Sequence, residues 1–90
     1  MTQDEFAERL GVLISEAMDG AGMSAGRVTK AIEQGIAVLE HTITDVGGSP
    51  FSRALAGLIS DAVYSAGWNA DRVIATLRQA IADIQEAEAA

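Results

Sequence analysis

Residues 51–86 read FSRALAGLISDAVYSAGWNADRVIATLRQAIADIQE, and they align without a gap on residues 6–41, which read FAERLGVLISEAMDGAGMSAGRVTKAIEQGIAVLEH. The offset between the two segments is constant at 45 positions. The identical pairs are Phe6/Phe51, Leu10/Leu55, Leu13/Leu58, Ile14/Ile59, Ser15/Ser60, Ala17/Ala62, Ala21/Ala66, Gly22/Gly67, Ala25/Ala70, Arg27/Arg72, Val28/Val73, Gln34/Gln79, Ile36/Ile81 and Ala37/Ala82. Self-similarity at a fixed period is typical of a structural unit that is repeated along a chain. The alignment therefore predicts one helical unit that occurs twice.

The composition indicates a single small domain, residues 1–90, whose partners are not anionic. The chain is 49% hydrophobic, which is too apolar for a disordered protein. It has 13 acidic and 6 basic residues, a net charge of -7, and the basic residues form no run. Phosphate contacts and anionic membranes both need clustered Lys and Arg, so direct binding to nucleic acid or to a membrane is disfavoured. The same charge favours a partner protein with a basic surface.

Cysteine content and hydropathy favour a cytoplasmic location. The chain has no Cys, so disulfides and thiolate chemistry are excluded. No apolar run approaches the roughly 20 residues that span a bilayer. Residues 1–8 are polar and acidic, whereas a secretory signal begins basic and then becomes apolar.

The first copy begins with an amphipathic helix. Thr2 followed by Glu5 matches a capping box, which places the helix start near Gln3. Its apolar residues at helical spacing are Phe6, Leu10, Leu13, Ile14, Ala17 and Met18. The glycines of residues 19–22, DGAG, are expected to end the helix, because glycine readily adopts the left-handed conformation of a C-terminus.

The second helix is expected from about Ala25 to Thr44, with Ser24 as its N-cap. Its buried face is expected to consist of Val28, Ile32, Ile36, Leu39 and Ile43. Gly35 lies inside this helix at a cost of roughly 1 kcal/mol relative to Ala. Its counterpart in the second copy is Ala80, and a small residue at both positions indicates a close helix crossing.

The second copy repeats the arrangement after a linker, residues 46–50. Its glycines stop one helix, Ser49 caps the next, and Pro50 occupies the first helical position, where its missing N–H has no cost. A third helix is expected from residue 51 to 64 or 65, and a fourth from about 70 to 87, with Asn69 as its cap. The inward residues are Phe51, Leu55, Leu58, Ile59, Ala62 and Val63 in the third helix, and Val73, Ile74, Leu77, Ile81 and Ile84 in the fourth.

These elements predict an all-α fold of four helices, a compact bundle built as a tandem duplicated helical hairpin with pseudo-two-fold symmetry. Repeat one covers about residues 3–45, the linker about 46–50, and repeat two about 51–87. The hairpins bury their apolar faces against each other, or alternatively splay apart and pair with a second copy of the chain.

Part of the sequence resembles a helix-turn-helix, a DNA-binding motif. Residues 6–12, FAERLGV, resemble the opening of such a motif, but the apolar helical pattern continues past Gly11. The turns at residues 21–24 and 66–69 give a second form of the resemblance, in which the helices that follow carry Arg and Lys outward. The acidic charge makes DNA binding a distant alternative.

Few residues of this chain are suited to catalysis or to metal binding. His41 is the only histidine, and without a second His or any Cys it favours a surface residue near a helix end rather than a metal ligand. No paired nucleophile and base and no phosphate-binding glycine loop is present. We expect no enzyme activity, catalytic residue, metal or cofactor.

Two groups of residues are candidates for protein binding. The first helix presents an acidic strip of Asp4, Glu5, Glu8, Glu16 and Asp19, which is either a solvated face or a footprint for a basic surface. Tyr64 and Trp68 lie near the second hairpin turn. Trp68 precedes the Asn69 cap and has Val73 five positions later, the spacing of a hydrophobic staple. The other interpretation of both aromatic residues is an interface anchor.

The sequence therefore favours a small acidic, non-enzymatic module that docks on a larger protein as an adaptor or inhibitor. One form would occupy the basic groove of a nucleic-acid-binding protein, as compact acidic phage-encoded anti-defence proteins do. The alternative is a structural subunit that forms homo-oligomers such as a dimer.

Overall fold

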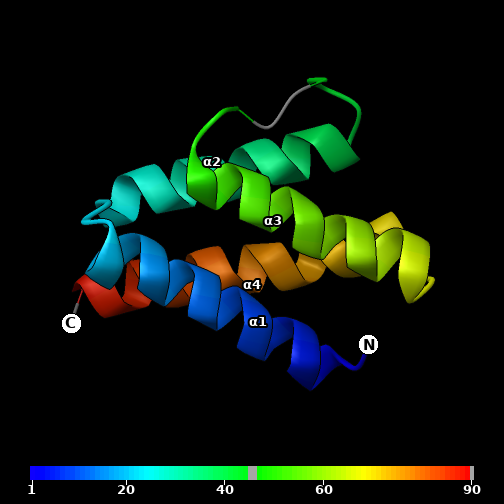
Figure 1. Cartoon of the computed structure of the whole chain (residues 1–90), viewed down its shortest axis with the longest axis horizontal. Helices are drawn as coiled ribbons and strands as arrows, with labels where there is room; N and C mark the ends of the chain where they lie inside the picture. Colours follow the sequence, from blue (N-terminus) through cyan, green and yellow to red (C-terminus); the bar gives the residue numbers. More distant parts are fainter. Residues whose placement is uncertain (45–46, 90) are drawn as a thin grey trace.

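The described residues fold into four α-helices. The computed structural model describes residues 1–44 and 47–89. The helices are α1 (Gln3–Ser15), α2 (Ala25–Leu39), α3 (Pro50–Ser60) and α4 (Ala70–Ala89), and no strand occurs in the described ranges (Figure 1). The all-α class is confirmed, and α4 extends two residues beyond its predicted end.

Each helix begins where a side-chain oxygen accepts a backbone N–H from the first turn. The pairs are Thr2 with Glu5 at 3.1 Å, Ser24 with Arg27 at 3.2 Å, Ser49 with Ser52 at 3.1 Å, and Asn69 with Arg72 at 2.8 Å. Pro50 occupies the first turn of α3. These contacts confirm the four predicted helix starts, because each satisfies an N–H that has no partner within its helix. The predicted linker begins at Val46, which lies outside the described residues.

Both α1 and α3 continue into a π-helical turn. These turns are η1 (Glu16–Gly20) and η2 (Asp61–Ser65). After each turn the chain reverses at a glycine in the left-handed region, Gly22 with φ 70° and Gly67 with φ 74°. The predicted glycine ending of the first helix is confirmed. The π-helical geometry was not predicted, since its hydrogen bonds reach back five residues instead of four.

The predicted end of α2 at Thr44 is wrong, because the helix stops at Leu39. His41 takes a left-handed conformation with φ 61°, and the N–H of Thr42 bonds to the carbonyl of Ala37 at 2.9 Å. This is the closing geometry of a Schellman motif. Ile43 consequently lies outside the helix and is 39% exposed, not buried as predicted. The three residues after His41 are all β-branched and favour helices weakly.

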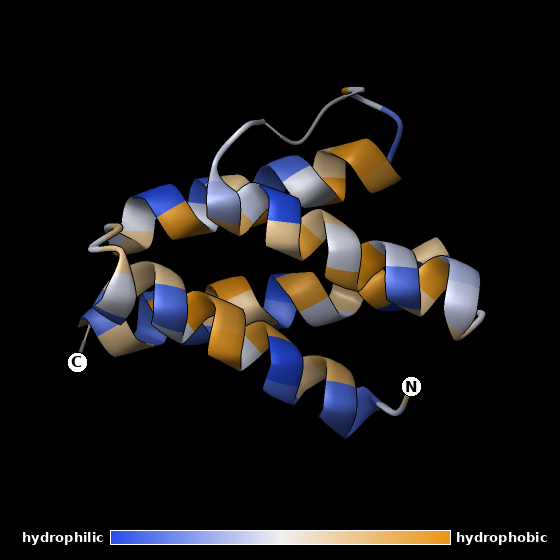
Figure 2. Cartoon of the chain, in the orientation of Figure 1, coloured by the Kyte–Doolittle hydropathy of each residue, from blue (hydrophilic) through white to orange (hydrophobic). Residues whose placement is uncertain are grey.

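The packing follows the order α1, α3, α2, α4. Helix α1 lies against α3, α3 against α2, and α2 against α4 (Figure 1). The hydrophobic turns of the helices gather toward the interior (Figure 2). The buried apolar residues are Phe6, Leu10, Ala17, Val28, Ala31, Ile32, Ile36, Phe51, Leu55, Leu58, Ile59, Ala62, Trp68, Val73, Ile74, Leu77 and Ile84. The radius of gyration is 12.2 Å, which matches the roughly 12 Å expected of a compact domain of this length.

Helix α2 packs against α3 at Gly35. A Cβ atom built at Gly35 would lie 3.3 Å from Cδ1 of Ile59 and 3.4 Å from Cδ2 of Leu55. The predicted crossing is thus confirmed and its partner identified. Glycine at this point leaves room for the side chains of Ile59 and Leu55, which a Cβ would meet in tight contact.

Gly11 differs from Gly35, because nothing lies within 4 Å of a Cβ built there. Helix α1 runs unbroken through this exposed position. We expect Gly11→Ala to raise the free energy of unfolding by about 1 kcal/mol, since Ala loses less conformational freedom in a helix. Urea unfolding followed by circular dichroism measures the change. A lower stability for this variant would contradict a continuous α1.

Candidate functional site

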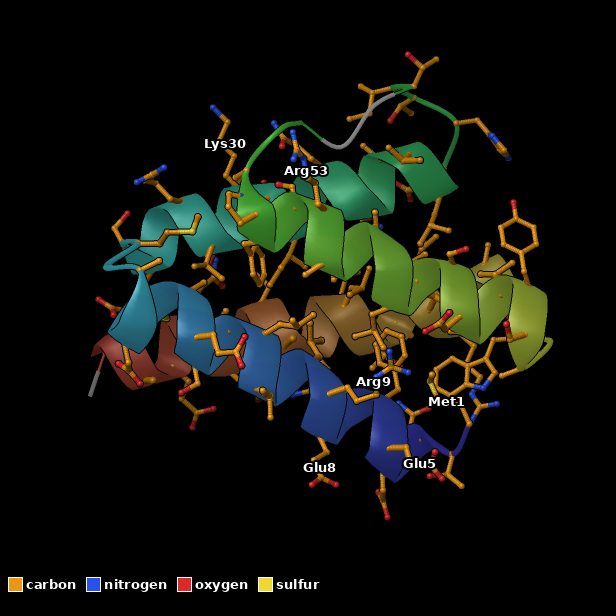
Figure 3. The ribbon with its side chains drawn as sticks, in the orientation of Figure 1. Met1, Glu5, Glu8, Arg9, Lys30 and Arg53 are labelled. Carbon is orange, nitrogen blue, oxygen red and sulfur yellow. The ribbon has the colours of Figure 1, made fainter. Side chains whose placement is uncertain are left out.

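The outward side of α1 and η1 carries the five acidic side chains that the sequence singled out. Phe6 and Leu10 are buried, so the opposite side of the helix faces solvent. The exposed residues on that side are Asp4, Glu5, Glu8, Glu16 and Asp19. The side chains of Glu5 and Glu8 project outward from α1 (Figure 3). We call these five residues the acidic face.

No residue of the acidic face belongs to an ion pair within residues 1–44 and 47–89. The ion pairs there are Arg9 with Asp61 at 3.0 Å and Arg78 with Glu40 at 3.1 Å. Both are roughly half exposed, so each contributes at most about 1 kcal/mol to stability. All 6 basic residues of the chain fall in the described ranges. The carboxylates of the acidic face are therefore not neutralised by direct contact with a cation.

Three basic side chains show how cations lie relative to the acidic face. Arg9 lies on α1, but its guanidinium pairs with Asp61 of η2 and so ties α1 to the second hairpin. Lys30 and Arg53 lie at the opposite edge from Glu8, over α2 and α3 (Figure 3). A surface that gathers one sign of charge attracts partners of the other sign over a distance of about one Debye length, or 8–10 Å.

A shallow groove runs along the seam between α1 and α3, beside the acidic face. Its lining residues are Glu8, Arg9, Val12, Leu13, Glu16, Ala54, Gly57, Leu58 and Asp61. Val12 is 52% exposed and lies among the carboxylates. An apolar floor with a charged rim is the arrangement found in protein interfaces. We call this feature the α1–α3 groove.

A more enclosed hollow adjoins the groove at the first hairpin turn. Its volume is about 310 Å³, and its walls include Met23, Arg27 and Phe51. It shares Leu13, Glu16 and Ala54 with the α1–α3 groove, so the two form one continuous surface. We call this hollow the Met23 pocket.

The structure separates the two predicted aromatic anchors. Tyr64 is 85% exposed on η2, whereas Trp68 is 4% exposed and belongs to the core. The Trp68 ring stacks on Phe6, with 5.0 Å between ring centroids and 26° between planes. The guanidinium of Arg72 covers the ring at 3.6 Å from its centroid. The indole Nε1–H of Trp68 donates to the carbonyl of Met1 at 3.1 Å. This burial leaves Tyr64, and not Trp68, accessible to a partner.

Sequence reasoning did not identify Val12 or the Met23 pocket. Val12 carried a signal, since it is an apolar residue on the polar side of the first helix. The Met23 pocket has no sequence signal, because its walls come from η1, α2 and the start of α3. Only the packing of α1 on α3 brings these segments together.

The other candidates receive less support from the geometry. The resemblance of residues 6–12 to a helix-turn-helix does not extend to the structure, because α1 continues through Gly11 to Ser15, as the apolar pattern past Gly11 predicts. In α4, the outward bases are engaged within the chain, Arg72 with Trp68 and Arg78 with Glu40.

Within residues 1–44 and 47–89, no three His, Cys, Asp or Glu side chains are placed to hold one metal ion. None of the helices there combines the length and the apolar character needed to cross a bilayer. Comparison of the chain with protein-family models, with curated proteins and with solved structures finds no match.

Proposed function

We propose that the protein is a non-enzymatic binding module that docks on a larger protein with a basic surface. The acidic face of α1 and η1 is the proposed docking surface. The observation that carries this proposal is that its five carboxylates are exposed and form no ion pair within the described residues. Uncompensated charge of one sign speeds encounter with an oppositely charged partner and discriminates against other partners.

The α1–α3 groove supplies the apolar contact that charge alone does not provide. Val12 and Leu13 line it between Glu8 and Glu16. Interfaces combine an apolar centre with a charged rim, since burial of apolar area holds the partner after the charges have oriented it. The groove and the acidic face together form the proposed interface.

One form of this module is an inhibitor of a nucleic-acid-binding protein. Carboxylates along one side of a helix present repeated negative charge, as backbone phosphates do, and would occupy a groove lined with Lys and Arg. The proposed setting is the cytoplasm, which the lack of Cys favours.

We also propose that the fold arose as a tandem duplicated helical hairpin. The sequence repeat supports this origin, and so does the recurrence of local geometry at the same offset. The N–H of Ala21 bonds to Glu16 at 2.9 Å, and the N–H of Ala66 bonds to Asp61 at 2.9 Å. A π-helical turn is an uncommon feature, so its presence at both hairpin turns favours a common origin over two independent ones.

Neutralising the acidic face tests the docking proposal. In Glu5→Gln/Glu8→Gln/Glu16→Gln, capture of the partner from a lysate of the source cells should fall by about tenfold, the lower end of steering effects. Glutamine at position 5 still suits the capping box. The matched control, Glu33→Gln/Glu86→Gln/Glu88→Gln, removes the same charge from exposed positions of α2 and α4. Quantitative mass spectrometry of the captured proteins gives the measurement.

The control variant should retain the same partner, and a wash at about 1 M salt should release it, because the Debye length falls to about 3 Å. Equal loss in both variants would show that only net charge matters and would contradict a docking surface on α1.

Tyr64 favours a second candidate, a structural subunit that pairs with copies of itself. Its ring is 85% exposed, and aromatic rings are enriched where interfaces exclude water. Such a subunit would gain mass with concentration and would tolerate salt, because apolar burial is not screened. Light scattering at several concentrations, in low and high salt, separates this candidate from the docking module.

A further inference from the structure

The second hairpin turn shows how this fold holds an aromatic ring. Trp68 lies between Phe6 on one face, at 5.0 Å between centroids, and the Arg72 guanidinium, at 3.6 Å. Its one polar atom is satisfied by the carbonyl of Met1 at 3.1 Å. Stacking against a ring and a cation over a ring are both favourable geometries for an indole.

The first hairpin turn has the same backbone but a smaller side chain. Met23 and Trp68 each follow a glycine, with φ 70° and 74°, and each donates its N–H to a carbonyl six residues back, at 2.9 and 2.8 Å. In each turn the next residue caps the following helix by accepting the N–H of Arg27 or Arg72. Met23 therefore stands at the place of Trp68, and Arg27 at the place of Arg72.

A cavity accompanies this difference in side-chain size. The Met23 pocket has a volume of about 310 Å³, and Phe51 and Arg27 are among its walls. Phe51 is buried in the first turn of α3, as Phe6 is in the first turns of α1. An unbranched Met side chain is narrower than an indole and does not fill the same space. The pocket is thus lined by Phe51 and Arg27, which are the counterparts of the ring and the cation that hold Trp68.

The surroundings of the pocket select what can enter it. Its mouth continues into the α1–α3 groove through Leu13, Glu16 and Ala54. Arg27 lies on the pocket wall as the counterpart of Arg72, whereas Glu16 at the shared edge and the rest of the acidic face favour Lys or Arg beside the entering group. We propose that the Met23 pocket receives an aromatic side chain of the partner protein, flanked by basic residues that meet the acidic face. This inference rests on the proposed docking function and names its anchor.

Two synthetic peptides test the anchor directly. One is a helical peptide of Lys and Ala with a single central Trp, and the other has Ala in place of that Trp. We expect the Trp peptide to bind about 30-fold more tightly, the effect of one buried aromatic anchor. Nuclear magnetic resonance of the protein with ¹³C-labelled methionine methyl groups measures both affinities. The Met23 methyl should shift with the Trp peptide, whereas Met1 should not.

A variant that fills the pocket provides the second test. Met23→Trp places in the first turn the residue that the second turn already holds, so we expect a higher melting temperature. It should bind the Trp peptide about 30-fold more weakly than the wild type does. Binding of the Ala peptide should stay unchanged and sensitive to salt. Met18→Leu, at a methionine that lines neither the Met23 pocket nor the α1–α3 groove, serves as the matched control and should bind both peptides as the wild type does.

Several results would overturn the inference, and they point to different errors. If both peptides bind equally at low salt and lose binding at high salt, the aromatic anchor is wrong and the docking proposal stands. If neither peptide binds at low salt, the proposed function fails and the anchor fails with it. Saturation by N-acetyltryptophanamide as tight as by the Trp peptide would assign the pocket to small molecules. A concentration-dependent Met23 shift without peptide, lost in Tyr64→Ala, would assign it to a second copy.

Discussion

Trp68→Ala is expected to lower the free energy of unfolding by about 4 kcal/mol, within the range of about 3–5 kcal/mol for truncation of a buried Trp or Phe. The ring is 4% exposed, and its removal ends the stacking on Phe6 and the contact with Arg72. It also leaves the carbonyl of Met1 without its indole donor. A domain of this size has a total stability of about 5–13 kcal/mol, so the loss is a large share of it. Thermal and urea unfolding by circular dichroism measure the effect.

Tyr64→Ala is the matched control, because it removes a neighbouring aromatic side chain that is 85% exposed. Its stability should change by less than about 0.5 kcal/mol, as for most surface substitutions. If Trp68→Ala instead unfolds like the wild type and loses only its partner, the tryptophan is an interface anchor. That outcome would contradict the packing described above.

The helix starts were predictable from the sequence because their causes are local. Ser24, Ser49 and Asn69 each accept an N–H three residues ahead, so a short stretch of sequence contains both partners. The inward faces were predictable in the same way, since the spacing of apolar residues follows the helical period. Gly35 was informative because a glycine inside a helix has a cost that only tertiary packing offsets.

The helix ends were harder to predict, because several closures compete with similar free energies. The apolar spacing favoured a continuation of α2 to Ile43, whereas the left-handed conformation of His41 closes the helix first. A non-glycine residue in that conformation gives no sequence signal. The π-helical turns η1 and η2 also have no local signature, since they differ from an α-helical turn by one residue of hydrogen-bond register.

One part of the candidate site was predictable from local sequence, and the other parts were not. The acidic face needed only the charges and the helical period of the first helix, so the sequence placed it. The surroundings of Trp68 could not be placed, because Phe6 and the carbonyl of Met1 lie at the other end of the chain. The Met23 pocket depends on which helices pack together, which periodicity does not determine. Helical periodicity predicts which side of a helix is exposed, whereas a pocket between helices can be located only once their packing is known.

Gly35→Leu is expected to lower the free energy of unfolding by about 3 kcal/mol, the upper end of the usual effect of overpacking a core. A Cβ alone would lie 3.3 Å from Ile59, so the remaining atoms of leucine would have to displace α2 from α3. Gly26→Leu is the control in the same helix, where no atom lies within 4 Å of a Cβ. That variant should be as stable as the wild type or up to about 1 kcal/mol more stable, since leucine favours helices. Urea unfolding compares the two. Equal stability of both variants would mean that α2 and α3 do not cross at Gly35, and the packing order of the helices would have to be revised.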